Sequence, residues 1–277
     1  MPTPVPDGAQ SRVALIILEN EEASEVMGNR NAPYLTALAR HYAESSDGHG
    51  LTHPSLPNYI ALVTGRTAGI TSDCLPSACS VPGRSLVDQL EQAGLSWRAY
   101  MESMPRACFD SPVDQVGLYA QRHNPFAYLT GVRRQPGRCS KVVPLSTLRA
   151  DARTGLARFS WITPNLCHDM HDCGVAAGDA WLRRTVPSLL GALGPRGLLI
   201  ITFDEGTTNA GCCGRDAGGR ILTVLAGRGA RRGAVSNAPV DHYSTLATVE
   251  AVLGLPRLGG ASSAPVLTSL LAPGLIP

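Results

Sequence analysis

Three hydrophobic segments, far apart in the chain, each end on polar side chains that carry oxygen atoms. They cover residues 15–20, 159–165 and 199–206. Continuous apolar runs of this kind are typical of strands buried on both faces of a parallel sheet. In open α/β sheets, ligands bind at the carboxyl ends of such strands. The three segments therefore predict one shared polar site at the edge of a sheet, of a kind that can hold a metal ion.

Strand patterns and helix patterns alternate along the chain. Predicted strands cover residues 12–18, 96–101, 157–162, 198–203 and 221–226. Predicted helices cover residues 32–44, 55–64, 85–94, 144–153, 176–193 and 242–253. This alternation predicts an α/β fold with a largely parallel central sheet and helices on both faces.

No repeat or linker divides the 277 residues, a length that suits one domain with a substantial core. We therefore expect a single domain over residues 1–277. It has a Pro-rich lead-in at 1–11, and an irregular insertion at 103–143 that forms a lid or a substrate wall.

Charge and hydropathy exclude two classes of partner. The net charge is +2, and no block of Lys and Arg points to nucleic-acid binding. No run approaches the roughly 20 apolar residues that span a bilayer, so no stable membrane insertion is expected. The first residues, Met-Pro-Thr-Pro-Val-Pro, do not read as a signal peptide as written.

Eight cysteines, most of them in loop-like sequence, favour disulfides and hence a secreted, periplasmic or extracellular protein. Reduced thiols or a zinc site are the alternatives, but no CxxC spacing supports zinc. Cys74–Cys79 and Cys167–Cys173 could close small loops. Cys212 and Cys213 are adjacent, and because a bridge between neighbours is strained, we expect each to pair elsewhere. Sequence does not choose among the possible connectivities.

Ser55 precedes a predicted helix whose early residues include a proline. Backbone N–H groups at a helix start favour an anion, so a hydroxyl there faces any phosphate that those groups hold. Asn58, in the first turn, is placed to donate a further hydrogen bond. The alternative is a serine that only caps its helix.

Two acidic doublets at strand ends, Glu19-Asn20 and Asp204-Glu205, supply carboxylate and amide oxygens. Each alone could be a helix cap or a surface turn. Together, buried carboxylates are costly without a cation, and a divalent ion would relieve their repulsion. Oxygen ligands favour one Mg²⁺, Ca²⁺ or Mn²⁺ over zinc.

The segment from Asn165 to Cys173 packs two His and two Asp residues into a short loop after a strand. His168, Asp169 and His171 are candidates for metal ligands, phosphate donors or a general acid, and not all of them can serve. A Cys167–Cys173 disulfide would make this loop rigid.

The other histidines carry weaker signals. His242 opens the last predicted helix, and taken alone it is a cap or a packing residue. His41, His49 and His123 read as structural residues.

Taken together, these segments resemble the phosphoesterase family of bacterial acid phosphatases and phospholipases C, within the alkaline phosphatase-like superfamily. The matching pieces span residues 18 to 250 in the family's order. They are Leu18-Glu19-Asn20, His53-Pro-Ser55-Leu-Pro-Asn58-Tyr59, Pro164-Asn165 with Asp169-Met-His171-Asp172, Thr202-Phe-Asp204-Glu205-Gly206, and Asp241-His242-Tyr-Ser244 leading into Thr248-Val-Glu250.

The resemblance implies an alkaline phosphatase-like fold and a metal-dependent phosphomonoesterase that works through a phosphoseryl intermediate. Ser55 would be the nucleophile, and would also touch a metal held by Glu19, Asn20, Asp204 and Glu205. His171 would bind phosphate or assist the leaving group, and His242 would be a further catalytic residue. His53, Asn58, Asn165, His168 and Asp169 would contact the substrate, a small phosphate ester or a phospholipid.

Three other functions remain open at this point. The first is a phospholipase C or another phosphodiesterase of the same family. The second is a metal-independent acyl hydrolase that uses Ser55 and His242, although the Gly-x-Ser-x-Gly motif is missing. The third is a non-catalytic protein that binds phosphate or glycan.

Overall fold

The computed structural model describes residues 11–214 and 217–277, so nearly all of the predicted lead-in lies outside the described residues. Within these described residues, nine strands form one sheet in the order β4-β3-β5-β1-β6-β7-β2-β8, and β9 pairs with β2. The strands are β1 (Arg12–Leu18), β2 (Ala43–His49), β3 (Trp97–Met101), β4 (Val142–Pro144), β5 (Phe159–Thr163), β6 (Gly197–Phe203), β7 (Arg220–Ala226), β8 (Ala234–Ser236) and β9 (Val240–Asp241).

The sheet is mostly parallel, and only β7 runs antiparallel to its neighbours β6 and β2. At its centre β1 lies between β5 and β6, and Leu15 pairs with Trp161 on one side and with Ile200 on the other. The carboxyl ends of β1, β5 and β6 therefore meet at one edge, as the three apolar segments predicted. The α/β fold class is confirmed.

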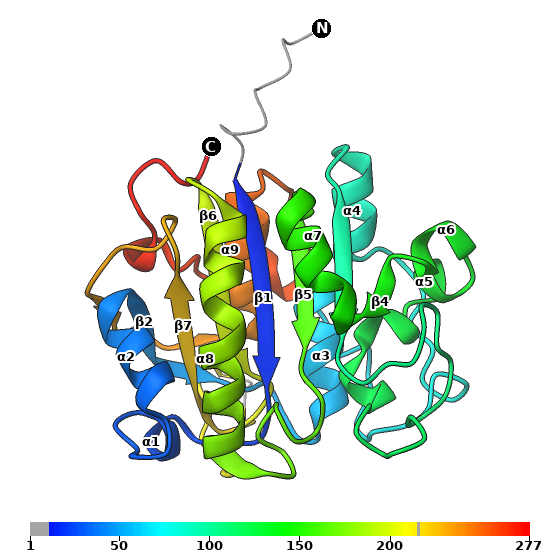
Figure 1. Ribbon diagram of the computed structural model, residues 1–277, viewed down its shortest axis with the longest axis horizontal. Coiled ribbons are helices and arrows are strands. Elements are labelled where there is room, and N and C mark those ends of the chain that lie inside the picture. Colours follow the sequence, from blue (N-terminus) through cyan, green and yellow to red (C-terminus); the bar gives the residue numbers. More distant parts are fainter. Residues whose placement is uncertain (1–10, 215–216) are drawn as a thin grey trace, which may run out of the picture.

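Helices cover both faces of the sheet (Figure 1), with α8 in front of β6 and α9 behind the sheet. The helices are α1 (Ala23–Val26), α2 (Pro33–His41), α3 (Ser55–Thr64), α4 (Leu86–Gln92), α5 (Thr130–Arg133), α6 (Pro136–Cys139), α7 (Leu148–Thr154), α8 (Gly174–Leu193) and α9 (His242–Val252). Alternate residues of β1 enter opposite layers, so that Leu15 packs in one hydrophobic core and Ile16 in the other.

Two predicted helices have different bounds in the structure. The helix expected to reach residue 44 ends at His41, and the unpredicted strand β2 starts at Ala43. The sequence of β2, Ala-Glu-Ser-Ser-Asp-Gly-His, has no apolar alternation, and its strand conformation comes from pairing with β7, β8 and β9. The helix expected from residue 144 begins at Leu148, because residues 142–144 form β4 beside β3.

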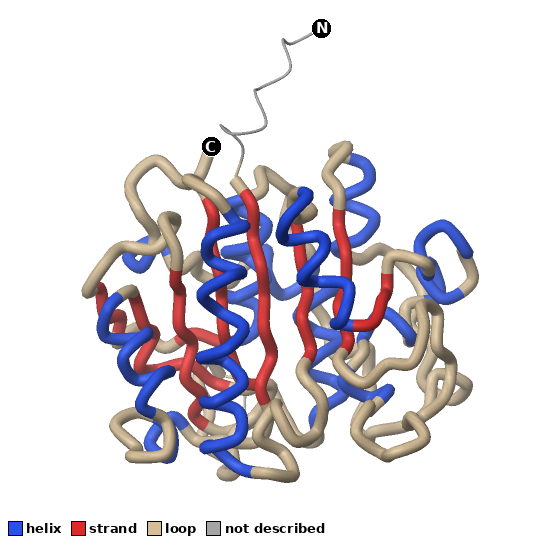
Figure 2. Tube along the Cα trace, viewed as in Figure 1, coloured by secondary structure: helices blue, strands red, loops and turns tan. Residues whose placement is uncertain are grey.

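The segment 103–143 lies at one end of the sheet, beyond β3 (Figures 1 and 2). It is less irregular than predicted, because it contains α5, α6 and the 3-10 turns η2 (Gln121–His123) and η3 (Pro125–Ala127). A disulfide between Cys108 and Cys139 joins its two halves.

All eight cysteines are paired. The predicted Cys74–Cys79 and Cys167–Cys173 bridges are present. The expectation that Cys212 and Cys213 pair elsewhere is wrong, because they bond to each other. Among residues 11–214 and 217–277, no helix combines the length and the apolar character needed to cross a membrane.

Candidate active site

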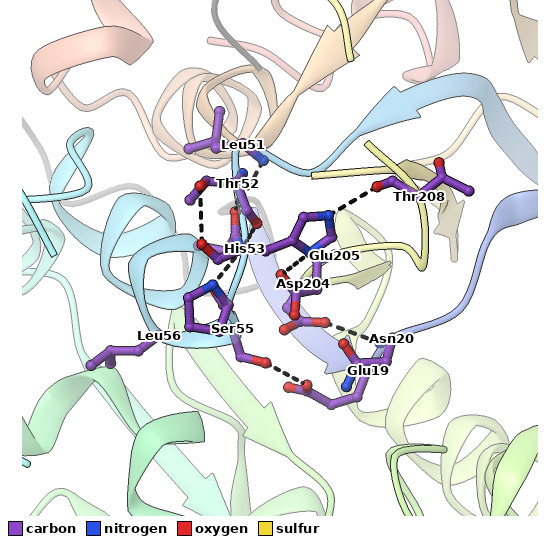
Figure 3. Close-up of polar contacts among 12 residues, drawn as sticks. Glu19, Asn20, Leu51, Thr52, His53, Ser55, Leu56, Asp204, Glu205 and Thr208 are labelled. Atoms are coloured by element: carbon purple, nitrogen blue, oxygen red, sulfur yellow. Dashed lines mark hydrogen bonds and ion pairs between the residues drawn. The ribbon is translucent and has the colours of Figure 1, made fainter. Parts of the chain in front are cut away.

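Ser55 and Glu19 meet where the end of β1 faces the start of α3 (Figure 3). Pro54 takes the cap position and Ser55 is the first helical residue, one position later than a capping serine. The Ser55 Oγ donates a hydrogen bond to Glu19 Oε2 at 3.1 Å. Tyr59, one turn along the same face of the helix, donates its hydroxyl to Glu19 Oε1. Both oxygens of this fully buried carboxylate therefore accept hydrogen bonds from one helix face.

Asn58 fixes the turn that presents Ser55. Its Oδ1 accepts hydrogen bonds from the N–H groups of Leu51 and Thr52, at 3.0 and 3.3 Å. Its Nδ2 donates to the carbonyl oxygens of Thr52 and Pro54, at 2.7 and 3.3 Å. Both amide hydrogens are thus used on the backbone. These contacts differ from the expected hydrogen bond to phosphate and make Asn58 a positioning residue.

Asp204 and Glu205 follow β6 and lie across from Ser55 (Figure 3). Asn20 has a left-handed backbone (φ 54°), and its N–H donates to Asp204 Oδ1 at 3.2 Å. The other oxygen, Oδ2, is buried and has no hydrogen-bond partner among the described residues. A buried carboxylate oxygen with no partner is a group that a cation can satisfy.

His53 orients Glu205. Its Nε2 lies 2.9 Å from the carbonyl oxygen of Thr208, and its Nδ1 lies 2.7 Å from Glu205 Oε2. A carbonyl oxygen only accepts, so His53 Nε2 must carry a hydrogen. The short contact between His53 Nδ1 and Glu205 Oε2 then needs a second proton, which lies between these two atoms. Burial, and then the charge of Asp204, raise the pKa of Glu205 to about 9. His53 therefore contacts a proposed metal ligand, where direct substrate binding was expected.

His123 joins the same cluster, although the sequence suggested only a structural role. Its Nε2 lies 3.5 Å from Glu19 Oε1, and its Nδ1 lies 3.3 Å from Asp169 Oδ2. Each of these three buried residues offers one possible ligand atom, and the three atoms lie within 4.8 Å of one another. The ring stacks on Tyr59, with centroids 5.3 Å apart. Burial lowers the pKa of His123 to about 3, so its ring is neutral. No motif in the surrounding segment could have identified it.

The loop after β5 brings two of its four candidates to the cluster. Asp169 is fully buried there, and its Oδ1 accepts a hydrogen bond from the N–H of His171. The His171 ring lies 5.9 Å from that of His123, centroid to centroid, and is partly exposed. Asn165 instead accepts hydrogen bonds from the N–H groups of Cys167 and His168.

His168 points toward a different group of side chains. Its Nδ1 lies 2.9 Å from Glu102 Oε2, and its ring stacks on Trp181. Asn165 and His168 thus shape and anchor the loop, and their direct contact with substrate stays a prediction.

His242 contacts the cluster through the backbone of Asp204. It is fully buried at the start of α9, and its Nε2 donates to the backbone carbonyl of Asp204. Burial lowers the pKa of His242. This contact is with the backbone of Asp204, and a catalytic role for His242 stays a prediction.

The cluster concentrates negative charge in a buried space. Burial, reinforced by Asp204 and Asp169, raises the pKa of Glu19 well above its usual value. Burial also raises the pKa of Asp204, and raises that of Asp169 to about 7. Carboxylates held this close are stable when they are protonated or when they share a cation. The donor set, carboxylate oxygens with one imidazole, fits a divalent metal ion.

Glu22 anchors the segment that follows Glu205. Its Oε1 accepts hydrogen bonds from the Thr208 N–H at 3.0 Å and from the Thr208 hydroxyl at 2.8 Å. Its Oε2 accepts from the N–H of Arg220 at 3.1 Å. Glu22 thereby ties the stretch beside His53 to the start of β7.

We expect Glu22→Ala to lower the free energy of unfolding by about 2–3 kcal/mol, because it leaves several donors unsatisfied. Urea denaturation measures this loss. Thr208→Val removes the hydroxyl contact with Glu22 and the hydrogen bond that this hydroxyl accepts from the Ala210 N–H, and it should cost about 1 kcal/mol. Equal losses in the two variants would contradict the anchoring role of Glu22.

Comparison with known proteins finds relatives that are named as phosphatases. The sequence profile of the Phosphoesterase family matches residues 17–256. Phosphatidylinositol-3-phosphatase of Mycobacterium tuberculosis is 33% identical over 265 residues, which cover 94% of this chain and 82% of that protein. A probable acid phosphatase of Kluyveromyces lactis is 29% identical over 269 residues, covering 92% of this chain and 61% of that longer protein.

A solved structure shares the fold. A protein of the alkaline phosphatase superfamily from Vibrio parahaemolyticus superposes with a TM-score of 0.63 at 13% identity, covering 96% of this chain and 72% of the other. The match of the family profile extends from the end of β1 to beyond α9 and includes every residue of the carboxylate cluster described above. The chain therefore belongs to the Phosphoesterase family.

Proposed function

We propose that this protein is a metal-dependent phosphomonoesterase in which Ser55 attacks phosphorus. Membership of the Phosphoesterase family, with relatives named as phosphatases, makes it a hydrolase acting on phosphoric esters. The observation that carries the finer assignment is the position of the Ser55 hydroxyl. It lies at the first residue of α3 and is hydrogen-bonded to a buried carboxylate in an acidic cluster.

In this proposal Glu19, Asn20, Asp204 and Glu205 hold one divalent ion together with Ser55, and His123 and Asp169 complete its surroundings. The predominance of oxygen donors favours Mg²⁺, Ca²⁺ or Mn²⁺ over Zn²⁺. When bound, the ion supplies charge neutralisation for the phosphoryl group and lowers the pKa of the serine hydroxyl.

The chain's own groups account for the remaining chemistry. Backbone N–H groups at the start of α3 bind phosphoryl oxygens. Ser55 Oγ forms a bond to phosphorus while the bond to the leaving oxygen breaks, and Glu19 Oε2 is placed to receive the serine proton. His171, at the partly exposed side of the cluster, acts as the general acid and gives a proton to the leaving alkoxide. Water then attacks phosphorus and gives its proton to His171, while the bond between Ser55 Oγ and phosphorus breaks. Ser55 Oγ takes its proton back from Glu19, so that phosphate is released and both groups are restored.

A phospholipase C or another phosphodiesterase is the second candidate. The relatives favour a monoesterase, because the one named for a lipid substrate is a phosphatase.

The four disulfides favour an oxidising, extracytoplasmic location.

We expect turnover of p-nitrophenyl phosphate to exceed that of p-nitrophenyl phosphorylcholine by at least about tenfold in kcat/KM, a difference of about 1.4 kcal/mol. A monoester dianion offers one more charged oxygen to the cation and the helix N-terminus than a diester does. Initial rates with both substrates, measured with and without chelator, test this. A preference for the diester would assign the phospholipase C activity instead.

A further inference from the structure

Asp73 lies beside the proposed nucleophile, and the reaction described above does not use it. Its Oδ1 accepts a hydrogen bond from the N–H of Leu56 at 3.0 Å. Leu56 directly follows Ser55 in the first turn of α3, where backbone N–H groups have no partner within the helix. The side chain of Asp73 is 32% exposed, so solvent and solutes can reach it.

The other oxygen of Asp73 faces Arg122, at 3.6 Å from Arg122 Nε. Arg122 also reaches toward His171, with its Nη2 3.4 Å from His171 Nε2. The Arg122 side chain is 28% exposed, and Arg122 immediately precedes His123 of the cluster. The accessible side of the cluster therefore carries Asp73, Arg122 and His171.

Both partners of Asp73 are groups that proteins use to bind phosphate. An N–H at a helix N-terminus and an arginine guanidinium each favour an anion with several oxygen acceptors. A carboxylate and a phosphoryl group present similar pairs of oxygens to such donors.

We propose that Asp73 competes with the phosphoryl group of the substrate for the Leu56 N–H and for Arg122. When the substrate binds, its phosphoryl oxygens take both donors and Asp73 turns toward solvent. Asp73 thus weakens substrate and product binding, and Arg122 is a phosphate ligand. Ser55, the residue directly before Leu56, donates its hydroxyl to the buried Glu19 carboxylate. This inference rests on the proposed function, because it assumes that phosphorus reaches Ser55.

A simpler role for Asp73 would be to cap α3. The chain contains a matched control for that role, since Asp88 accepts the Ser85 N–H at the start of α4 and pairs with Arg138 at 2.8 Å. Asp88 therefore makes the same two kinds of contact as Asp73, at a helix that carries no proposed nucleophile. Neutralising each aspartate separates competition at the site from helix capping.

The test measures binding of inorganic phosphate by calorimetry and KM for p-nitrophenyl phosphate, both in the presence of Mg²⁺. We expect Asp73→Asn to lower the phosphate dissociation constant and KM about tenfold, and Arg122→Gln to raise both about tenfold. Asp88→Asn should change neither by more than about twofold. If Asp73→Asn does not fold, Asp73→Ser removes the same charge with a shorter side chain.

Opposite signs for the Asp73 and Arg122 variants support the competition. An Asp73→Asn protein that melts earlier but binds phosphate no more tightly would overturn it and leave only the capping role. An inactive wild-type protein would refute the proposed function, but the phosphate titrations would still decide whether Asp73 competes.

Discussion

Replacing Ser55 by alanine is expected to reduce phosphatase turnover by at least about a thousandfold, because the group that bonds to phosphorus is removed. The fold should survive. The Ser55 hydroxyl donates its hydrogen bond to Glu19, and Tyr59 still donates to that carboxylate when the hydroxyl is gone. Initial rates with p-nitrophenyl phosphate measure the loss, and a thermal melt within a few degrees of the wild type shows that the protein is folded.

Ser85 provides a matched control, because it also lies at a helix start, where it forms a capping box with Asp88. Ser85→Ala should lower the free energy of unfolding by about 1 kcal/mol and leave turnover unchanged, since α4 carries no candidate catalytic group. If Ser55→Ala retained more than about a tenth of wild-type turnover, the nucleophile would have to be another group.

Trapping the phosphoseryl intermediate would identify the nucleophile directly. The wild type, quenched in acid during turnover, should carry one phosphoryl group on the peptide that contains Ser55, and mass spectrometry detects it. Ser55→Ala should carry none. Direct attack by water would leave both proteins unmodified and would contradict the covalent route, even if Ser55→Ala were inactive.

The elements that sequence predicts well are those whose signal is local. Buried central strands such as β1 and β6 are continuous apolar runs, and their polar ends mark the catalytic edge wherever the strands pair. Helix α3 is predictable for the same reason, because its apolar run and its early proline lie within ten residues. These local features are enough to predict that Glu19, Ser55 and Asp204 lie at one site.

What sequence could not predict depends on contacts between distant segments. Strand β2 is polar and becomes a strand through its partners, mainly β7. His123 lies in a segment of short turns, and only the folded chain brings its ring between Glu19 and Asp169. The contact of Asp73 with the Leu56 N–H is equally invisible in the sequence, because an aspartate beside a cysteine loop has no characteristic spacing from a helix start.

Removing the cation is expected to lower both activity and stability. Burial raises the pKa values of Glu19 and Asp204, and the charges of Asp204 and Asp169 raise that of Glu19 further. The ionised cluster therefore destabilises the fold unless a cation is shared. An ion present at a hundred times its dissociation constant stabilises the folded state by about 2.7 kcal/mol. For a chain of this size, that corresponds to a fall in Tm of roughly 5–10 °C when chelator is added. Calorimetric melts with and without chelator measure this shift.

Asp204→Asn separates the contribution of the ion from that of the carboxylates. The amide removes one charge from the cluster and one ligand from the ion, so this variant should melt at the same temperature with and without chelator. It should also be more stable than the chelated wild type, because less repulsion remains in the buried cluster. Asp47→Asn, at a partly exposed position of β2, keeps the wild-type response if the effect is specific. A wild type whose Tm and turnover both resist chelator would exclude the cation and favour a metal-independent hydrolase.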